Sequence, residues 1–598
     1  MRKPDNITYW INDKPPLHIS VAMALQQLSF LSVYLVVSPY FARTLELDQQ
    51  QSLQLISATL IASGFGVVLQ TLRRFGIGSG LFCPLQATSS TSGAIVLAKA
   101  SGGLGAVFGA VGIIGVSQIL FSFIFHRFRS VFNIQVAGVA VLLIGLGLGH
   151  NGLVLILHPG DGNLTMQEQW IAFLATLGTM IIANVWFKGF VHLFSAFIGL
   201  ATGLIACIAM ADIPEETQTL IDHAAWFYLP KPSMGNWSLD YQLLPPVIMT
   251  GLFLALHGFG GLVAAQRFNN ADWKRPEMDS VQRGIVAEGI TNLMSSLLQG
   301  VPITSSGGAV SMAAATGCTS RYVAYWLGAL SILLAFMPKF ILFWTLLPDT
   351  LLGSAMVFLS CFTLMSGLQI ITSRLLDNRK VLAIGLGVLL GISFEPHRTI
   401  LLDNTPSWME PFLLSGVSIG ISVTLALTML FRLGSSTRER RRFDACHTSQ
   451  TVLSDFLEHQ GKSWGAAREL VQRSIYATWQ VFELLTDYEL FLRNTDGKEV
   501  VEVETISDEF KFCVVIRYEG MTVPLAVAPP TPEEMIENEI AVLQMAGYLI
   551  RQLADEVYTE FSSEKSFFSD AKANAPFTEG QQSASVHQTA ELRLVFNL

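Results

Sequence analysis

The chain has 598 residues, of which 51% are hydrophobic and only 14% are charged, whereas about 25% of the residues of a soluble globular protein are charged. This composition, with a mean hydropathy of +0.46, indicates a membrane protein. The net charge of −9 excludes a basic nucleic-acid-binding protein. The six cysteines are scattered singly, so they form neither a disulfide framework nor a metal-binding motif, and we expect no cofactor and no metal.

Apolar runs of about 20 residues, the length that crosses a bilayer, fall into two sets. Residues 1–16 are polar and predict a cytoplasmic N-terminus without a cleaved signal peptide. The sets predict one seven-helix repeat over 17–210 and a second over 245–432, separated by an extracytoplasmic linker at 211–244. The fourteen predicted segments lie near 17–40, 52–71, 76–98, 103–125, 132–155, 169–187, 189–210, 245–265, 283–299, 301–317, 322–346, 350–372, 381–394 and 411–432.

Basic residues in the loops between these segments gather on one side of the predicted topology. They are Arg2, Lys3, Arg73, Arg74, Arg127, Arg129, Lys188, Arg267, Lys274, Arg275, Arg283, Arg321, Arg374, Arg379 and Lys380. By the positive-inside rule this side is cytoplasmic. We therefore expect a multi-pass protein of the plasma (inner) membrane with both termini in the cytoplasm.

Seven segments in each half mean that the second half enters the membrane from the side opposite to the first, as in an inverted repeat. The third segment of each half, at 76–92 and 300–309, is short, rich in hydroxyls and broken by Pro and Gly. Small residues also allow close helix packing. However, matched broken segments in two halves indicate a binding site near the middle of the membrane, because non-helical backbone there must line a cavity or be buried in protein.

The composition changes after Arg432, where residues 433–449 form a basic juxtamembrane linker. Residues 450–598 predict a separate cytoplasmic domain. Its patterns favour a helix over about 463–488, strands at 499–506 and 510–518, a long helix from 532 to about 561 and a last strand at 591–596. The Ser, Ala and Gln-rich stretch at about 562–589 predicts a flexible loop.

Several motifs in residues 15–432 resemble those of the nucleobase–ascorbate transporters, which include bacterial xanthine, uric acid and uracil permeases. They lie at 25–28 (Leu-Gln-Gln-Leu), 85–89 (Leu-Gln-Ala-Thr-Ser), 135–145, 283–289, 300–302 (Gly-Val-Pro) and 316–321. The resemblance implies a core domain and a gate domain, with a nucleobase-like substrate bound where short strands of the third and tenth segments meet the eighth helix. It also implies alternating access, a homodimer and no enzymatic activity.

The resemblance nominates substrate-binding residues in the first, third, eighth and tenth segments. They are Gln26, Gln27, Gln86, Ala87, Thr88, Ser89, His257, Thr304, Ser305, Ser306, Gly307 and Gly308. This chain departs from the family at its charged positions. The family's Gln-His pair falls on Gln26 and Gln27, the acid of the eighth helix falls near His257, and the acid or Gln of the tenth segment falls on Gly308.

Because both acids are missing, other groups must recognise the base and carry any coupled proton. His257 is one candidate, because imidazole titrates near neutral pH and an ionisable residue inside a membrane segment is a functional candidate by default. A neutral histidine that only hydrogen-bonds a neighbouring helix is the alternative. Glu288 is the second proton-coupling candidate, and a structural role is its alternative.

The patterns at 546–558 and 591–596 resemble the end of an anti-sigma-factor serine kinase of the histidine-kinase-like ATPase fold, over about 450–598. Residues that such kinases need for Mg²⁺ and nucleotide are replaced by Asp487, Tyr518 and Thr522. The resemblance therefore implies an α/β sandwich without ATP hydrolysis that contacts a cytoplasmic protein partner or regulates the membrane part.

Three functions remain open from the sequence. The first is secondary transport of xanthine, urate or uracil-like bases. The second is transport of an anion by the same fold, because helix N-termini without nearby carboxylates attract negative charge. The third is a membrane sensor that signals through its cytoplasmic domain.

Overall fold

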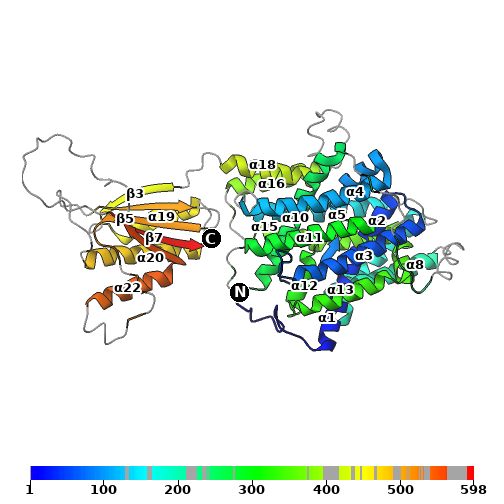
Figure 1. The fold of residues 1–598 in the computed structure, drawn as a ribbon, viewed down its shortest axis with the longest axis horizontal. Helices are drawn as coiled ribbons and strands as arrows, with labels where there is room; N and C mark the ends of the chain where they lie inside the picture. The colour runs from blue at the N-terminus through cyan, green and yellow to red at the C-terminus, as the bar shows by residue number, and fades with distance from the viewer. Residues whose placement is uncertain are drawn as a thin grey trace, which may run out of the picture. The chain divides into compact units, whose positions relative to one another are not determined.

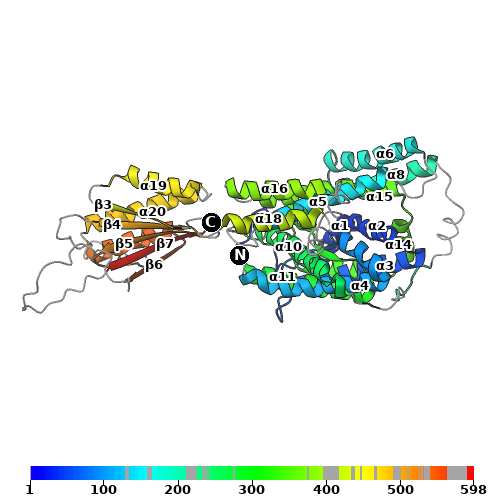
Figure 2. The same cartoon turned by 90° about the horizontal axis from the view of Figure 1, so that it is seen from above.

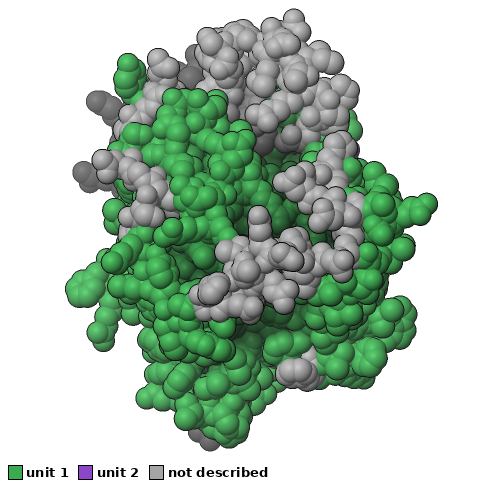
Figure 3. Space-filling view, turned by 90° about the vertical axis from the view of Figure 1, so that its right-hand side faces the viewer, with its two compact units in different colours: residues 1–373, 379–430 green, residues 374–378, 431–598 purple. Residues whose placement is uncertain are grey.

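The computed structural model describes most of the chain in twenty-one stretches. They are residues 2–127, 134–157, 165–210, 225–231, 237–238, 241–271, 273, 276–372, 376, 378–394, 416–432, 438–444, 448–463, 468–488, 490, 500–507, 511–523, 525–526, 529–530, 539–561 and 589–597, with the single residues 273, 376 and 490 included among them. The chain divides into two compact units, residues 1–373 with 379–430 and residues 374–378 with 431–598. Figure 3 shows one face of the first unit.

The first unit is built almost entirely of helices (Figure 1). In its first half these are α1 (Leu17–Tyr34), α2 (Val37–Thr44), α3 (Gln49–Thr71), α4 (Ser92–Arg127), α5 (Ile134–Leu157), α6 (Met166–Val185), α7 (Phe190–Leu193) and α8 (Ser195–Met210). In its second half they are η1 (Tyr241–Leu243), α10 (Leu244–Phe268), α11 (Met278–Leu298), α12 (Gly307–Ala315), α13 (Tyr322–Ala335), α14 (Pro338–Thr345), α15 (Asp349–Ile371), α16 (Asn378–Phe394) and α18 (Gly416–Arg432).

Most of the predicted membrane segments coincide with one of these helices or with two neighbouring ones, but the segment predicted at 76–98 is helical only from Ser92 and the one at 301–317 only from Gly307. Among the described residues, six helices are long and apolar enough to cross a membrane, or seven if α13 and α14, which meet at a bend of 80°, form one span. The helical membrane architecture is therefore confirmed, while a total of fourteen crossings stays a prediction. Within α4 the backbone leaves helical geometry at Gly102 and Gly103, at the predicted border between the third and fourth segments.

Two short strands interrupt the helices at the predicted breaks. Strand β1 (Leu85–Ala87) pairs antiparallel with β2 (Ile303–Ser305), and Gln86 lies opposite Thr304. All six residues are buried. The first part of α4 follows β1 and α12 follows β2, so each strand leads into a helix whose N-terminus starts near the same ladder.

Glycines allow the long helices of this unit to approach closely. A Cβ atom added to Gly152 of α5 would lie 2.8 Å from the carbonyl oxygen of Gly353 in α15. The same relation joins Gly64 of α3 to Gly328 of α13, at 2.8 Å. Helices can approach this closely only where both have a glycine at the point of contact, as in the small-residue seams of membrane proteins.

The N-terminal arm is an ordered part of this unit, and Ile7 and Ile11 in it are buried. The backbone N–H groups of Thr8 and Tyr9 donate to the Gly317 carbonyl, and the Trp10 indole donates to the Asn269 carbonyl at 3.0 Å. The arm thus ties the end of α10 to the connection between α12 and α13.

The second unit is a five-stranded antiparallel sheet with the order β3-β4-β5-β7-β6. Its strands are β3 (Arg438–Asp444), β4 (Val500–Ser507), β5 (Lys511–Glu519), β6 (Glu556–Phe561) and β7 (Thr589–Asn597), and its helices are α19 (Gln450–Ser463), α20 (Arg468–Asp487) and α22 (Glu539–Leu553). Figure 2 shows α19 and α20 along one face of this sheet. On that face Val503, Val514 and Leu594 pack with apolar side chains of all three helices in one core.

Three sequence predictions for this unit differ from the structure. The helix predicted to continue to about 561 is wrong, because α22 ends at Leu553 and β6 begins at Glu556. Val557, Tyr558 and Thr559 are strand formers, and they pair with β7, so sheet pairing overrides the helical pattern. The predicted linker contains strand β3, and α19 precedes the predicted helix at 463–488. The predicted loop at 562–589 lies almost wholly outside the described residues.

The other face of the sheet carries a network of charges centred on Arg517 of β5. Its guanidinium contacts the carboxylates of Glu504 at 2.7 Å, Glu502 at 3.4 Å and Glu591 at 2.8 Å. Glu504 is fully buried. Burial alone would raise the pKa of Glu591, but Arg517 and Arg593 outweigh it and hold that pKa below its ordinary value of 4.5.

Replacing Arg517 by methionine should destabilise the second unit by about 3 kcal/mol, because it leaves the buried Glu504 and Glu502 with only the more exposed Arg440 and Arg442 as ion-pair partners. Hydrogen exchange of β4, β5 and β7 in the full-length protein measures this loss. Arg593→Met, at a half-exposed arginine, is the matched control and should change exchange little. The pKa of Glu591 is lower in the folded protein than its ordinary value of 4.5, so its ion pairs stabilise the folded unit fully above about pH 4.5. This stabilisation is lost as the pH falls below 4.5 and through the lowered pKa. Equal protection in wild type and Arg517→Met would contradict the role given to the network.

Candidate functional site

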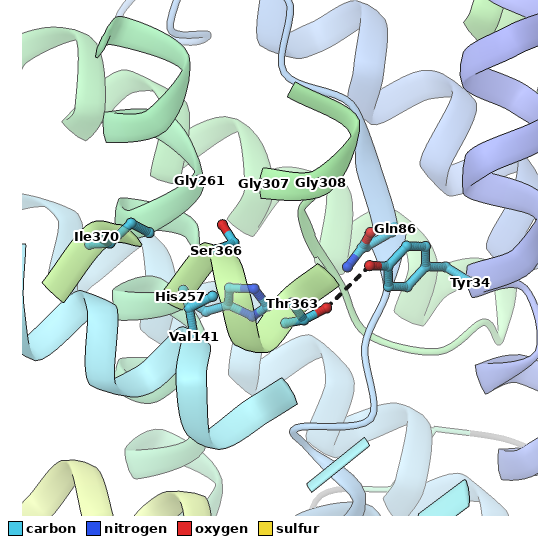
Figure 4. A pocket seen from close by; sticks show the side chains of 10 residues that line it. All are labelled: Tyr34, Gln86, Val141, His257, Gly261, Gly307, Gly308, Thr363, Ser366 and Ile370. Carbon is cyan, nitrogen blue, oxygen red and sulfur yellow. Dashed lines mark hydrogen bonds between the residues drawn. The ribbon is translucent and has the colours of Figure 1, made fainter. Parts of the chain in front are cut away.

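A cavity lies where the β1–β2 ladder meets α10, α15 and the start of α12 (Figure 4). The empty space between these residues, open solvent at the mouth included, is about 290 Å³, and the part that is enclosed has room for about one water molecule. The lining residues come from α1, β1, α5, α10, α12 and α15, and they are Tyr34, Gln86, Val141, His257, Gly261, Gly307, Gly308, Thr363, Ser366 and Ile370. None of these lining side chains is a carboxylate, a lysine or an arginine.

Gln86 and His257 are the two predicted side chains that line this cavity. Gln86 is 7% exposed and its Oε1 has no hydrogen-bond partner among the described residues. His257 is 3% exposed and its Nδ1 likewise has none. A buried polar atom without a partner is costly, so both atoms are suited to a ligand that supplies the missing hydrogen bonds.

The N-terminus of α12 forms another wall of the cavity. Gly307 and Gly308, the first residues of this helix, line the cavity, and Ser306 caps the helix by accepting from the Ala309 N–H at 3.2 Å. A Cβ atom at Gly308 would lie 2.7 Å from the Phe30 ring. Phe30 thus fills the space that a side chain at Gly308 would need, while the backbone at the start of α12 and the positive end of its helix dipole lie at this wall of the cavity.

The remaining predicted residues surround the ladder but do not line the cavity. Gln27 of α1 donates to the Ala309 carbonyl at 3.2 Å, and the Gln26 Nε2 is buried without a partner. The Thr88 hydroxyl pairs with Ser90 at 2.9 Å. Ala87 pairs with Ile303 in the ladder, and the carbonyl of Ser89 accepts from the Ser92 N–H at the start of α4.

Thr304 and Ser305 of β2 hydrogen-bond to Glu288 of α11 and are not among the residues that line the cavity. The Glu288 carboxylate accepts from the Ser305 N–H at 3.2 Å, from the Ser305 hydroxyl and from the Thr304 hydroxyl at 3.4 Å. Gln118 of α4 donates to it at 3.4 Å. All four partners are protein groups, so Glu288 fastens β2 to α11 and α4 and does not line the cavity.

Asn292 continues this fastening one turn along α11. Its side chain accepts from the Ile303 N–H at 2.7 Å and donates to the Ile303 carbonyl at 2.9 Å. Strand β2 therefore pairs with β1 on one edge and with side chains of α11 on the other. Gly258 of α10 lies against Glu288, since a Cβ there would be 2.3 Å from the carboxylate.

Sequence reasoning did not identify Tyr34, Thr363 and Ser366 as lining residues. The Tyr34 hydroxyl of α1 lies 3.2 Å from the Thr363 hydroxyl of α15. In the sequence, a residue with a hydroxyl on a long apolar helix looks like an ordinary packing residue. Tyr34 and Thr363 are also 329 positions apart in the chain. Only the packing of α1 against α15 brings them into one wall.

The model of the permease family Xan_ur_permease, described as "Permease family", matches residues 18–398. This chain belongs to that family. It is 26% identical to the xanthine permease XanP of Escherichia coli K12, over 71% of this chain and 94% of that permease. It is also 26% identical to the nucleobase transporter PlUacP of Paenibacillus larvae, over 68% of this chain and 92% of that transporter. The chain is therefore a multi-pass membrane transporter and not an enzyme.

Solved structures that resemble this chain include two transport proteins. One is the transmembrane domain of the cyanobacterial bicarbonate transporter BicA, with a TM-score of 0.42 and 13% identity, covering 69% of this chain and 97% of that one. The other is the murine anion transporter Slc26a9 in its inward-facing state, with a TM-score of 0.43 and 13% identity, covering 72% of this chain and 70% of that one.

Replacing Glu288 by alanine should lower the stability of the membrane unit by about 3 kcal/mol, because buried donors of Thr304 and Ser305 lose their acceptor. Glu288→Gln keeps one acceptor oxygen and should cost about 1 kcal/mol. The measurement is the thermal midpoint of the purified protein. Glu277→Ala, at an exposed ion pair with Arg73, is the control. An unchanged midpoint in Glu288→Ala would refute the structural role.

Proposed function

We propose that this chain is a secondary active transporter of a nucleobase-like substrate of the xanthine, urate or uracil class. The observation that carries the proposal is the cavity at the β1–β2 ladder with its two buried, unpartnered atoms, Gln86 Oε1 and His257 Nδ1. The relatives named for xanthine and nucleobase transport point to the same class of substrate.

The chemistry of the cavity matches a heterocycle with alternating N–H and C=O groups. Gln86 Oε1 is an acceptor for a ring N–H, and the N–H groups at Gly307 and Gly308 are donors for a ring carbonyl. His257 can donate or accept, since its tautomer adapts to the ligand. Val141 and Ile370 supply apolar walls for the faces of the ring.

We propose that the membrane unit is an inverted repeat of seven plus seven segments and that this repeat underlies its transport mechanism. Helix contacts in the two halves correspond when each segment is exchanged for the one seven positions later. The contact between α3 and α13 has its counterpart in the contact between α11 and α4. In the same way, the contact between α5 and α10 has its counterpart in the contact between α15 and α1. The pairs β1–β2 and α5–α15 map onto themselves. Such symmetry supports alternating access, in which one bundle moves against the other around a central site.

Two contacts join α1 and α2 to α15, one next to the cavity and one at the start of α15. Near the cavity, Tyr34 of α1 bonds Thr363 of α15. Towards the other end of α15, Arg43 of α2 forms an ion pair with Asp349 and donates to the Leu347 carbonyl. We propose that the ion pair closes the extracytoplasmic side and opens during transport.

His257 and Glu288 are our two candidates for carrying a coupled proton. They are the buried histidine and the buried carboxylate of the described membrane unit, and an ionisable group at this depth is rarely without function. Glu288→Gln separates the two roles of that residue. If it folds normally but loses proton-driven accumulation, Glu288 carries the proton. If it transports normally, the role falls to His257.

Transport of an anion is the second candidate function. It is favoured by the α12 N-terminus at Gly307 and by the lack of a carboxylate among the cavity's lining residues. A membrane sensor is the third reading, and it would bind a ligand without accumulating it.

We further propose a homodimer in the inner membrane, with both termini in the cytoplasm. The second unit would be a non-catalytic domain of the histidine-kinase-like ATPase type that binds a cytoplasmic protein or regulates transport. Its sheet, covered by helices on one face, supports this coarse assignment, and Tyr518 is buried with its hydroxyl donating to the Met521 carbonyl at 2.8 Å.

The proposal is tested by thermal-shift measurements on the purified protein with xanthine, urate, uracil, bicarbonate and sulfate. A ligand that binds only the folded state raises the thermal midpoint. We expect a shift with a neutral base, and a loss of affinity of at least about tenfold in His257→Ala. His192→Ala, at an exposed histidine, is the control. Shifts with anions alone, unchanged in His257→Ala, would favour the anion carrier instead.

Exchanging the charges of the Arg43–Asp349 ion pair is a separate test of whether this pair closes the extracytoplasmic side. Arg43→Ala should lower the rate of uptake of a labelled base by about tenfold or more, since it removes the arginine that pairs with the largely buried Asp349 carboxylate. The double variant Arg43→Asp with Asp349→Arg should recover part of that rate. Lys99→Ala, at a solvent-exposed pair with Glu46, should transport normally. Uptake unaffected by Arg43→Ala would exclude the closing role.

A further inference from the structure

The linker between the two halves of the membrane unit carries a run of bulky, exposed side chains. Trp226 is 65% exposed, Phe227 69%, Tyr228 40% and Leu229 64%. These four residues, which we call the apolar segment, lie between α8 and α10 and outside the helices that are long enough to cross a membrane. A contiguous apolar patch of this kind is unfavourable in water and marks a surface that contacts a partner.

Two contacts fix the apolar segment to the bend between α13 and α14. The Tyr228 N–H donates at 3.0 Å to the carbonyl of Phe336, the residue at which α13 ends. The Lys339 ammonium of α14 lies 4.3 Å from the centre of the Trp226 ring, which is a cation–π contact. The segment is therefore docked on the protein at this bend, while most of its apolar side-chain surface stays exposed.

Helix α13, on which the apolar segment is docked, is too short to cross a bilayer by itself. Its 14 residues rise by about 21 Å, whereas the apolar core of a bilayer is about 30 Å thick. Helix α14 adds little height, because the two helices meet at a bend of 80°. With Arg321, which precedes α13, at the cytoplasmic surface, the other end of α13 lies within the apolar depth of the membrane.

The exposed face of α13 leads to the apolar segment. Trp326 and Leu333 are seven residues apart, so they share one side of the helix, and they are 40% and 50% exposed. Leu333 lies one turn before Phe336, to which the apolar segment is bonded. An apolar stripe with aromatic residues at both of its ends is typical of a surface that spans from one membrane interface to the other.

We propose that the apolar segment inserts into the lipid leaflet on the linker side, which is the extracytoplasmic leaflet in the proposed topology. Trp226, Phe227 and Leu229 then continue the apolar surface of α13 over the remaining height of about 9 Å. Lys339 and the exposed Lys231 place positive charge where phospholipid phosphates lie. The linker is thus held by lipid as well as by protein, and it helps to set the bilayer thickness in which the membrane unit is most stable.

The first experiment tests contact with lipid by photo-cross-linking of the full-length protein in vesicles of phosphatidylethanolamine and phosphatidylglycerol. The photoreactive amino acid p-benzoylphenylalanine replaces Phe227 or, as a control, Tyr476, a 55% exposed residue of the second unit. We expect mass spectrometry to find a phospholipid adduct at residue 227 and none at residue 476. Lys339→Met removes the cation beside Trp226 and should lower the yield at residue 227. Adducts with protein alone, or no adduct, at residue 227 would overturn the proposal.

The second experiment tests whether the apolar segment matches the protein to the bilayer. Wild type and the double variant Trp226→Ser with Leu229→Ser are reconstituted in phosphatidylcholines of increasing acyl-chain length, and the thermal midpoint is measured in each. The variant should reach its highest midpoint in a thinner bilayer than the wild type does, because its apolar surface is lower. Tyr476→Ser should keep the optimum of the wild type.

This comparison separates lipid matching from a general loss of packing. A variant that is merely less well packed has a lower midpoint in every bilayer, but its optimum thickness does not move. The same optimum in wild type and in the double variant would therefore contradict the proposal, whatever the difference in their midpoints.

Discussion

Two segments leave helical geometry inside the membrane unit, and their backbone groups must find partners within the protein. Lipid offers no hydrogen bonds, so an unwound segment at this depth is stable only if other chain atoms satisfy it. Here β1 and β2 satisfy each other through Gln86 and Thr304. The free edge of β2 is then bonded by Asn292 and Glu288 of α11. The cavity exists because this ladder ends next to the start of α12.

The same constraint explains how charge is used around the site. Glu288, the carboxylate of this network, is fully buried, and its oxygens accept hydrogen bonds from β2 and from Gln118. The cavity is left with neutral polar groups, a helix N-terminus and one histidine. A neutral heterocycle with its own donors and acceptors complements such a wall better than a strongly charged solute does, because every polar atom of the wall can find a partner.

Much of the architecture could be predicted from the sequence, because apolar length and loop charge respond directly to the membrane. The breaks at β1 and β2 were visible from Pro and Gly, and the kink at Gly102 and Gly103 falls at a predicted border. The candidate site was predictable only in part. Gln86, His257, Gly307 and Gly308 line the cavity, but Tyr34 and Thr363 reach it through the packing of distant helices. In the second unit, Val557 and Thr559 lie in a strand that the helical pattern concealed, since pairing with β7 is a long-range interaction.

The most direct test of the account is an experimental structure of the full-length protein with xanthine or uracil bound. We expect the base between Gln86, His257 and the N-terminus of α12, with a ring N–H within hydrogen-bond distance of Gln86 Oε1 and a ring carbonyl facing the N–H groups of Gly307 and Gly308. A base bound away from the β1–β2 ladder, with Gln86 Oε1 still unpartnered, would contradict the assignment of this cavity as the substrate site.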